Sequence, residues 1–203
     1  MRRLIILLIA MSLTLFAYCQ DDYVTSQLEK RAETDSIFSD STSSILPKKE
    51  INAFEGLHYF VVDPSYRIMA NFKVKIGKPF EMQTSTARLP VYHQYGVASF
   101  KIDGVRCKLN IYRQVKGLDN DSAANGYLFC PFNDMTNNVT SYGGGRYLDF
   151  KLIDVIGKKN IELDFNTCYN PYCAYNNRYS CPVPPKENKL KVKIEAGVKK
   201  WHE

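Results

Sequence analysis

Apolar and polar residues alternate along the segment YRIMANFKVKI, which covers residues 66–76. Successive side chains of a β-strand point to opposite faces, so a period of two predicts a strand that is buried on one face. The run VASFKIDGVRCKLNIYRQ, residues 97–114, has two strand-like halves separated by Asp103 and Gly104. This residue pair is preferred in tight type I′ turns, because both central positions need positive φ. The run therefore predicts a hairpin.

Further strand-like segments occur at residues 59–62, 89–95, 127–132, 147–156, 160–165 and 190–195. They are short, are separated by Gly, Pro and Asn turns, and do not alternate with helices. This arrangement predicts a mainly β fold, an antiparallel β-sandwich or partly open barrel, rather than a parallel βαβ fold. With 45% hydrophobic and 24% charged residues, the chain belongs to neither the disordered nor the fibrous class.

One α-helix is expected before the strands. Val24, Leu28, Ala32 and Phe38 recur at or near helical spacing. The SDSTSS segment that follows is typical of a loop, and Pro47 prevents the helix from continuing through it. We expect residues 20–46 to form this helix and loop, and residues 47–203 to form a single β-rich domain.

The first 19 residues have the pattern of an export signal. Arg2 and Arg3 precede an apolar run from Leu4 to Ala17, which is too short to span a bilayer comfortably. The sequence contains no second long apolar segment, which excludes a multi-span membrane protein. We expect residues 1–19 to be removed and the mature protein to be exported, as a periplasmic or secreted protein.

Two interpretations of the signal's end stay open. Ala17 and Cys19 fit the small-residue requirement for ordinary cleavage, which leaves Gln20 as the first residue. Alternatively, Cys19 is lipidated and the product is a lipoprotein anchored to the outer membrane. The acidic residues that follow resemble the export signal of some Gram-negative surface lipoproteins, whereas Tyr18 is bulkier than the residue that normally precedes a lipidated cysteine. A lipid on Cys19 is the one membrane contact that we expect.

The charge pattern argues against a nucleic-acid partner. The formal net charge is +6, and two of the 27 basic residues belong to the export signal. Lys189, Lys191 and Lys193 alternate with apolar residues, which indicates the solvent face of an amphipathic strand rather than a basic stripe for phosphates. The chain has no G-x-S-x-G or H-E-x-x-H motif. We expect neither a cofactor nor a metal.

The segment PFNDMTNNVTSYGGGRYLDF, residues 131–150, does not fit a simple strand. Three consecutive glycines, Gly143–Gly145, usually mean that the chain needs positive φ or that something approaches the backbone closely. Exposed amides beside Arg146 can hold a carboxylate or a phosphate, with Asp134 and Thr136 nearby in sequence. The alternative is a glycine-rich turn in which Arg146 pairs with an internal carboxylate such as Asp134 or Asp149.

The segment LDFNTCYNPYCAYNNRYSCPVPPKENKL, residues 163–190, predicts a long structured loop rich in Cys and Pro. It contains Cys168, Cys173 and Cys181, and export favours disulfides over free thiols or zinc. We expect a disulfide between Cys173 and Cys181, which would staple the loop. The alternatives are a zinc site that adds His93 to the three thiols, and a reactive Cys–His pair. Cys107 lies on the apolar face of its strand and is expected to be buried.

These two segments resemble the bacterial domain-of-unknown-function family 1684. The shared elements are PF-x-D-x-T, a TY-x-GGRY-like turn, DFN-x-x-YNP-x-CA and CP-x-PP-x-EN, and the resemblance covers nearly all of the mature chain. It implies no reaction, substrate or partner. Its signature positions are more polar than the core of a sheet requires, which favours a site. Those that we assign to a ligand site are Asp134, Thr136, Tyr142, Gly144, Gly145, Arg146, Asp164, Asn166, Tyr169 and Asn170.

We therefore expect an exported binding module for a small or extended ligand that is anionic or sugar-like, such as a glycan. Arg146 would bind the anion, and Tyr142 and Tyr169 would form a stacking wall. One alternative is a hydrolase in which Asp134 or Asp164 is the general base. Another is a purely structural protein in which Arg146 neutralises a buried Asp134 or Asp164. Whether the protein is an enzyme, and its oligomeric state, stay open.

Overall fold

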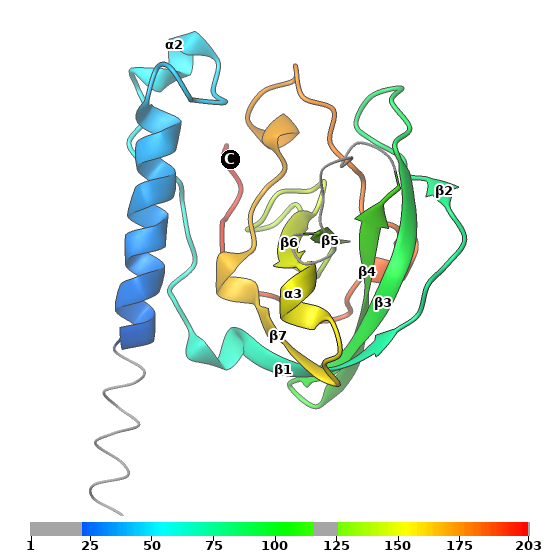
Figure 1. Cartoon of the computed structure of the whole chain (residues 1–203). Coiled ribbons are helices and arrows are strands. Elements are labelled where there is room, and N and C mark those ends of the chain that lie inside the picture. The colour runs from blue at the N-terminus through cyan, green and yellow to red at the C-terminus, as the bar shows by residue number, and fades with distance from the viewer. Residues whose placement is uncertain (1–21, 116–125, 203) are drawn as a thin grey trace, which may run out of the picture.

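The computed structural model describes residues 22–115 and 126–202. Its main element is a seven-stranded sheet in the order β6-β5-β4-β3-β1-β7, with β2 paired to β3 (Figure 1). All of these strand pairs are antiparallel, and the strands are β1 (Arg67–Val74), β2 (Phe80–Glu81), β3 (Val91–Ile102), β4 (Val105–Gln114), β5 (Tyr127–Phe132), β6 (Arg146–Lys151) and β7 (Asn160–Asp164). The prediction of a mainly β, antiparallel fold is confirmed. The expected export signal and Cys19 lie outside the described residues.

The predicted hairpin is the β3–β4 pair. Asp103 and Gly104 have φ values of 49° and 78°, as a type I′ turn requires. Gly96 of β3 lies where the register shifts after Gln94. A Cβ atom on Gly96 would lie 2.4 Å from the ring of Phe72 in β1. The glycine therefore permits the close approach that lets the sheet bend here.

The sheet curls into a half-barrel whose two ends approach each other. Tyr147 of β6 and Tyr169, which follows β7, exchange backbone hydrogen bonds of 2.9 and 3.1 Å. The concave interior holds the main hydrophobic core, in which Leu128, Leu163 and Ile194 are fully buried. The expected partly open barrel thus describes the architecture better than a sandwich of two sheets.

Residues 190–195 alternate as predicted but do not join the sheet. Leu190, Val192 and Ile194 are buried, and the lysines between them are exposed. The Leu190 N–H donates to Asn133 O at 2.7 Å, and the Met135 N–H donates to Val192 O at 2.9 Å. This segment therefore runs beside the loop that follows β5. The prediction that this segment is a strand of the sheet was wrong. Alternating apolar and polar residues indicate that one face of the segment is buried, but they do not indicate which segment its backbone hydrogen-bonds.

Other elements differ from the predictions. Residues 59–62 form only an isolated bridge, between Tyr59 and Val198. The predicted strand at residues 147–156 is shorter, because its second half forms α3 (Leu152–Val155), the turn that connects β6 to β7. The short helix α2 (Lys48–Ile51) and the strand β2 were not predicted. Both are too short to produce a periodic pattern.

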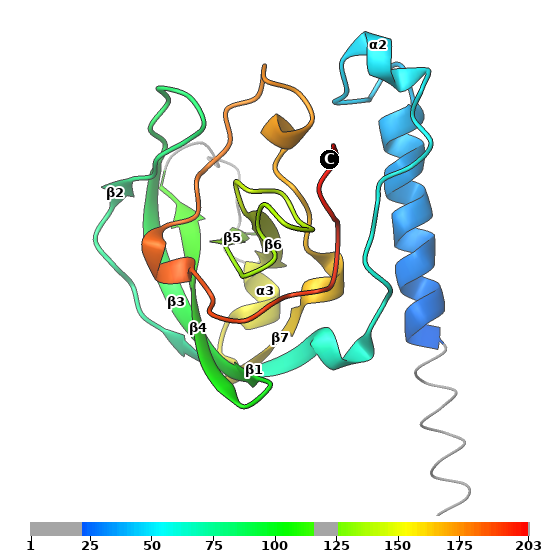
Figure 2. The ribbon, with the colours of Figure 1, turned by 180° about the vertical axis from the view of Figure 1, so that it is seen from behind.

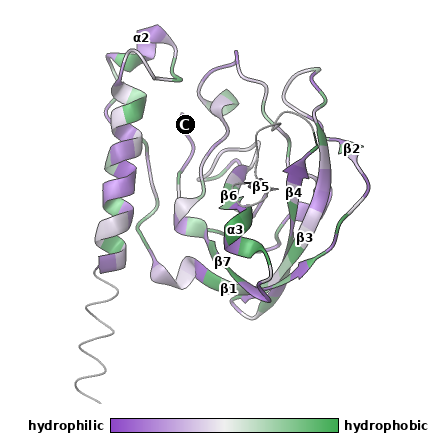
Figure 3. Cartoon of the chain, in the orientation of Figure 1, coloured by the Kyte–Doolittle hydropathy of each residue, from purple (hydrophilic) through white to green (hydrophobic). Residues whose placement is uncertain are grey.

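The N-terminal helix covers residues 22–39 and stands beside the half-barrel (Figures 1 and 2). Its face toward the barrel is largely polar, and most of the helix is purple or white in Figure 3. Tyr23 and Gln27 donate hydrogen bonds to Asp164 at 2.8 and 3.4 Å, and Arg31 donates to Phe60 O, in the segment between α2 and β1, at 2.8 Å. Phe38, at the far end, packs into a separate small hydrophobic cluster. In the described ranges, no helix has the length and hydropathy that crossing a membrane requires.

Candidate functional site

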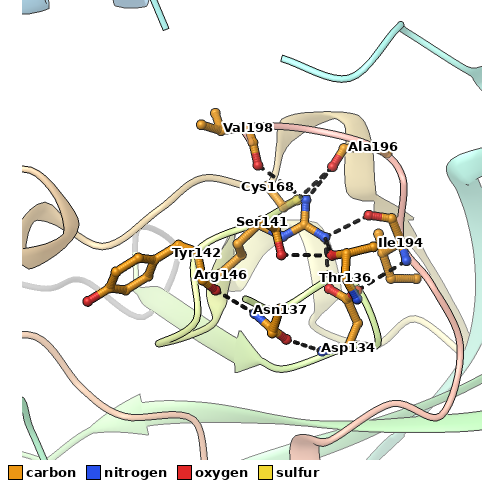
Figure 4. Close-up of polar contacts among 10 residues, drawn as sticks. All are labelled: Asp134, Thr136, Asn137, Ser141, Tyr142, Arg146, Cys168, Ile194, Ala196 and Val198. Carbon is orange, nitrogen blue, oxygen red and sulfur yellow. Dashed lines mark hydrogen bonds and ion pairs between the residues drawn. The ribbon is translucent and has the colours of Figure 1, made fainter. Parts of the chain in front are cut away.

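Arg146, the residue expected to bind an anion, is buried completely: its side chain is 0% exposed. Nη2 lies 2.8 Å from Asp134 Oδ2 and 2.7 Å from Ile194 O, and Nη1 lies 2.5 Å from Ala196 O (Figure 4). The guanidinium therefore hydrogen-bonds backbone carbonyls of the C-terminal segment. It connects β6 to that segment.

The expected anion clamp is therefore wrong. Asp134 neutralises the charge of Arg146, and the second oxygen of Asp134 accepts from the Thr136 N–H at 2.7 Å. The hydroxyls of Thr136 and Ser141 share a hydrogen bond of 2.7 Å. We call these four residues, Asp134, Thr136, Ser141 and Arg146, the arginine cluster. The alternative interpretation, an internal ion pair between Arg146 and Asp134, is confirmed.

The glycines at 144 and 145 are required by packing and not by a ligand. A Cβ atom on Gly145, whose φ is +92°, would lie 2.4 Å from Asn133 Oδ1 and 2.5 Å from Pro184 Cγ. One on Gly144 would lie 2.4 Å from the ring of Tyr142. The backbone is approached closely, as the triglycine indicates, but by the chain itself. Neither glycine contacts the cavity described next.

A cavity of about 720 Å³ lies between the N-terminal helix and the half-barrel. Because side chains alternate along a strand, Phe129 of β5 and its cross-strand partner Asp149 of β6 lie on the face opposite the core. Tyrosines dominate the wall: Tyr59, Tyr92, Tyr127, Tyr147, Tyr169, Tyr172 and Tyr175. The cavity is the concave, mostly apolar kind of site that small ligands occupy.

Among the residues predicted to bind ligand, Asn166, Tyr169 and Asn170 line this cavity. Asn166 exchanges hydrogen bonds of 2.8 and 2.9 Å with the backbone of Asp63. The side-chain amide of Asn170 donates to a backbone carbonyl at 2.8 Å. Asp164 accepts from the N-terminal helix, as described above. These polar residues therefore hold together the segments that form the wall.

Arg31, on the N-terminal helix, lines the cavity and carries unused hydrogen-bonding capacity. Its guanidinium lies 4.6 Å from the centre of the Tyr59 ring, and Nη1 donates to Phe60 O at 2.8 Å. Nε and Nη2 are buried, and they have no hydrogen-bond partner among the described residues. Burial lowers the pKa of Arg31, but an arginine still stays protonated at neutral pH. The side chain is therefore a positive charge with a free donor edge.

Asp149 brings a carboxyl group to the sheet side of the same cavity. The hydroxyl of Tyr169 donates to Asp149 Oδ2 at 2.6 Å, and Tyr127 lies beside both. Burial raises the pKa of Asp149, against the opposing effect of the two tyrosine hydrogen bonds. The residue as a whole is exposed to solvent, and it lines the cavity. A carboxyl in this position can accept a hydrogen bond from a ligand.

Sequence reasoning did not assign Arg31, Tyr127 or Asp149 to the site. The signal for Arg31 was its spacing of four from Gln27, which places both on one helix face. The signal for Asp149 was its spacing of two from Tyr147, which places both side chains on one face of a strand. Polar residues at such spacings are normally solvated, so neither pattern distinguishes a cavity wall from a surface.

The fold and the cavity define a β-rich domain with a curled antiparallel sheet and a ligand-sized cavity closed on one side by a helix. This chain belongs to the family described as protein of unknown function (DUF1684), whose model matches residues 52–199. The helix that carries Arg31 precedes the matched range. The solution NMR structure of an uncharacterized protein from Haloarcula marismortui is similar, with 34% identity and a TM-score of 0.67 over 90% of this chain and 96% of that one. No curated protein matches the chain.

Proposed function

We propose that this protein is an exported binding module that holds a small anionic ligand in the tyrosine-lined cavity. The volume of about 720 Å³ lies within the range that small ligands occupy. Tyrosine rings offer flat apolar faces for a sugar or aromatic ring, and their hydroxyls offer hydrogen bonds at the edge. The observation that carries the proposal is the unpaired donor edge of Arg31 in this cavity.

The free nitrogens of Arg31 suit a carboxylate or a phosphate. Nε and Nη2 lie on one edge of the planar guanidinium, so their N–H groups point in parallel and match two oxygens of one anion. Leaving charged donors buried without a partner is costly. The backbone bond of Nη1 and the contact with Tyr59 hold the group in place. The guanidinium of Arg31 would therefore already be held in position when an anionic ligand binds.

The other end of the cavity suits a hydroxyl or an amine. Asp149 and Tyr169 offer oxygens there, and Asp149 lies opposite Phe129 in the sheet. A ligand with an anionic group, a ring and a hydrogen-bond donor would thus contact the helix, the tyrosines and β6 together. Sugar acids and hydroxylated aromatic acids have this pattern.

The geometry favours binding over the hydrolase alternative. Asp134 is 0% exposed and bonded to Arg146, so it cannot reach a substrate as a general base. Both carboxylate oxygens of Asp164 accept from Tyr23, at 2.8 and 2.9 Å. Both carboxylates are therefore engaged within the protein, and neither lines the cavity.

Replacing Arg31 by glutamine is expected to weaken binding of an anionic probe. Glucuronate and 4-hydroxybenzoate are suitable probes, because each joins a carboxylate to a hydroxylated ring. Loss of a charge-assisted pair costs about 1.5–3 kcal/mol, which is roughly 10- to 100-fold in affinity. Calorimetric titration, with NMR shifts to locate the bound probe, measures the change.

The matched control is Arg178→Gln. Arg178 also lies over a tyrosine, 4.8 Å from the ring of Tyr179, but it is exposed and does not line the cavity. Its replacement should leave the affinity unchanged. Equal affinities for Arg31→Gln and the wild type, or shifts confined to residues outside the cavity, would contradict the proposal.

Export and the Cys173–Cys181 disulfide belong to the same proposal, because an oxidising compartment favours the pairing. Intact mass of the protein from soluble and membrane fractions, before and after reduction, tests both. We expect a chain that starts at Gln20, or one lipidated at Cys19 in the membrane fraction. Reduction should add two hydrogen atoms. A soluble chain that retains Met1 and does not change on reduction would contradict both parts.

A further inference from the structure

Two cysteines of the long loop, Cys173 and Cys181, are free thiols in this structure, and Cys181 lines the cavity. The Cys173 N–H donates to the sulfur of Cys181 at 3.2 Å, which places the two cysteines side by side. Cys181 is 8% exposed, whereas Cys173 is the more accessible of the two. Two cysteines this close to each other are candidates for a disulfide.

Further hydroxyl groups surround the sulfur of Cys173. Tyr142 and Ser85 lie beside it, close enough to influence its pKa. Ser85 is held in place by its backbone N–H, which donates to Cys181 O at 2.8 Å. Gly144 leaves room for the Tyr142 ring, which points away from the arginine cluster in Figure 4. The glycine-rich turn thus brings a phenol to this thiol, a role that the sequence did not predict.

The surroundings make the two thiols unequal. Hydrogen bonds from Cys181, and then from Ser85 and Tyr142, lower the pKa of Cys173 to about 6 against the effect of burial. The hydrogen bond with Cys173, followed by burial, raises the pKa of Cys181. Burial also raises the pKa of Cys130 and Cys168. As the pH rises, the thiolate therefore forms first on Cys173, which is the more accessible cysteine of the pair.

We propose that Cys173 and Cys181 form a thiol–disulfide exchange site whose substrate is a disulfide, with Cys173 as the attacking thiol. This inference extends the proposed disulfide and is independent of any ligand in the cavity. The Cys173 thiolate attacks one sulfur of the substrate R–S–S–R, forms a mixed disulfide and expels R–S⁻. Cys181 then loses its proton and attacks the Cys173 sulfur, which expels the second R–S⁻. The protein gives up two electrons, and the substrate leaves as one thiolate and one thiol, which takes the proton from Cys181.

The step is tested by the reaction of the reduced chain with 5,5′-dithiobis(2-nitrobenzoate), with Cys19→Ser to exclude a thiol that lies outside the described residues. This aromatic disulfide releases a coloured thiolate at each attack. We expect a fast phase that releases two equivalents, a protein two hydrogen atoms lighter, and no retained adduct. Cys181→Ser should release one equivalent rapidly and keep one adduct on Cys173. Cys173→Ser should lose the fast phase, and Cys168→Ser, a buried thiol in the same loop, should keep it.

The pH profile separates an activated thiol from an ordinary one. The rate of the fast phase should be half-maximal near pH 6 rather than near the ordinary value of about 8.5. Tyr142→Phe removes one hydrogen-bond donor and should move this midpoint upward, which makes Tyr142 a positioning residue. A second measurement uses the wild-type chain, so its result does not depend on whether a variant folds. The chain is labelled with iodoacetamide at pH 6, and the labelled cysteines are identified by peptide mapping. Iodoacetamide should label Cys173 at least tenfold faster than Cys130 or Cys168.

A midpoint near pH 8.5, a retained adduct in the wild type, or a fast phase that survives Cys173→Ser would overturn the assignment. So would equal labelling of Cys173 and the buried thiols. None of these results bears on whether the cavity binds an anion, so failure here leaves the proposed function standing. Conversely, loss of probe binding in Arg31→Gln leaves the thiol chemistry unchanged.

Discussion

Replacing Asp134 by asparagine is expected to lower the free energy of unfolding by about 3–5 kcal/mol, because it leaves a buried cation without its partner. The Arg146 side chain and that of Asp134 are both 0% exposed, and their atoms lie 2.8 Å apart. Asparagine keeps the shape of the aspartate but not its charge. Chemical denaturation at neutral pH, with a fixed slope, measures the change.

The matched control is Glu162→Gln, which makes the same acid-to-amide change in an exposed pair. Arg67 and Glu162 are also 2.8 Å apart, but their side chains are 38% and 42% exposed. We expect this variant to lose less than about 1 kcal/mol, because solvent screens surface pairs. Should Asp134→Asn lose no more than the control, the arginine cluster would not be structural, and Arg146 would again be a candidate ligand residue.

Replacing Asn188 by alanine is expected to cost more than about 3 kcal/mol, since it leaves several buried backbone groups without partners. Strands β4 and β5 pair at Tyr112 and Phe129. Beyond that point the side chain of Asn188 exchanges hydrogen bonds of 2.8 Å with both backbone groups of Asn110, and it donates to Pro131 O at 2.8 Å. One amide thus replaces a stretch of strand pairing.

The control for this prediction is Asn177→Ala, in the same long loop but exposed. It should change the free energy of unfolding by less than about 0.5 kcal/mol. Asn188→Asp tests the donors separately: it keeps an acceptor for the Asn110 N–H and loses both donated bonds. We expect it to be at least as destabilising as alanine. A loss below about 1 kcal/mol for either variant would show that β4 and β5 do not depend on this amide.

Much of the fold could be predicted because alternation is a local property. The strand predicted at residues 66–76 is β1, and the hairpin predicted from Asp103 and Gly104 is the β3–β4 pair. Both predictions were possible because the period of the side chains and the conformation of a turn depend on neighbouring residues. The prediction for residues 190–195 was wrong for the complementary reason. Its apolar face is buried as expected, but its backbone partners lie in the loop after β5, more than fifty residues earlier.

The candidate site was predicted only in part. Asn166, Tyr169 and Asn170 line the cavity, whereas Asp134, Thr136 and Arg146 form a structural cluster. The residues look alike in the sequence, because a polar group that binds a ligand and one that holds a loop need the same chemistry. The sequence offered both interpretations of Arg146, and burial decided between them.

By itself the sequence determined the mainly β class, the N-terminal helix and the buried faces of β1 and β4, because these follow from the spacing of residues within one helix or one strand. The tertiary structure decided which charge is paired and which is free. Arg146 and Arg31 have the same side chain, yet one meets Asp134 in the core, whereas the other lines a cavity and has two buried nitrogens without a partner among the described residues. That difference depends on contacts between segments far apart in the chain, which no local pattern encodes.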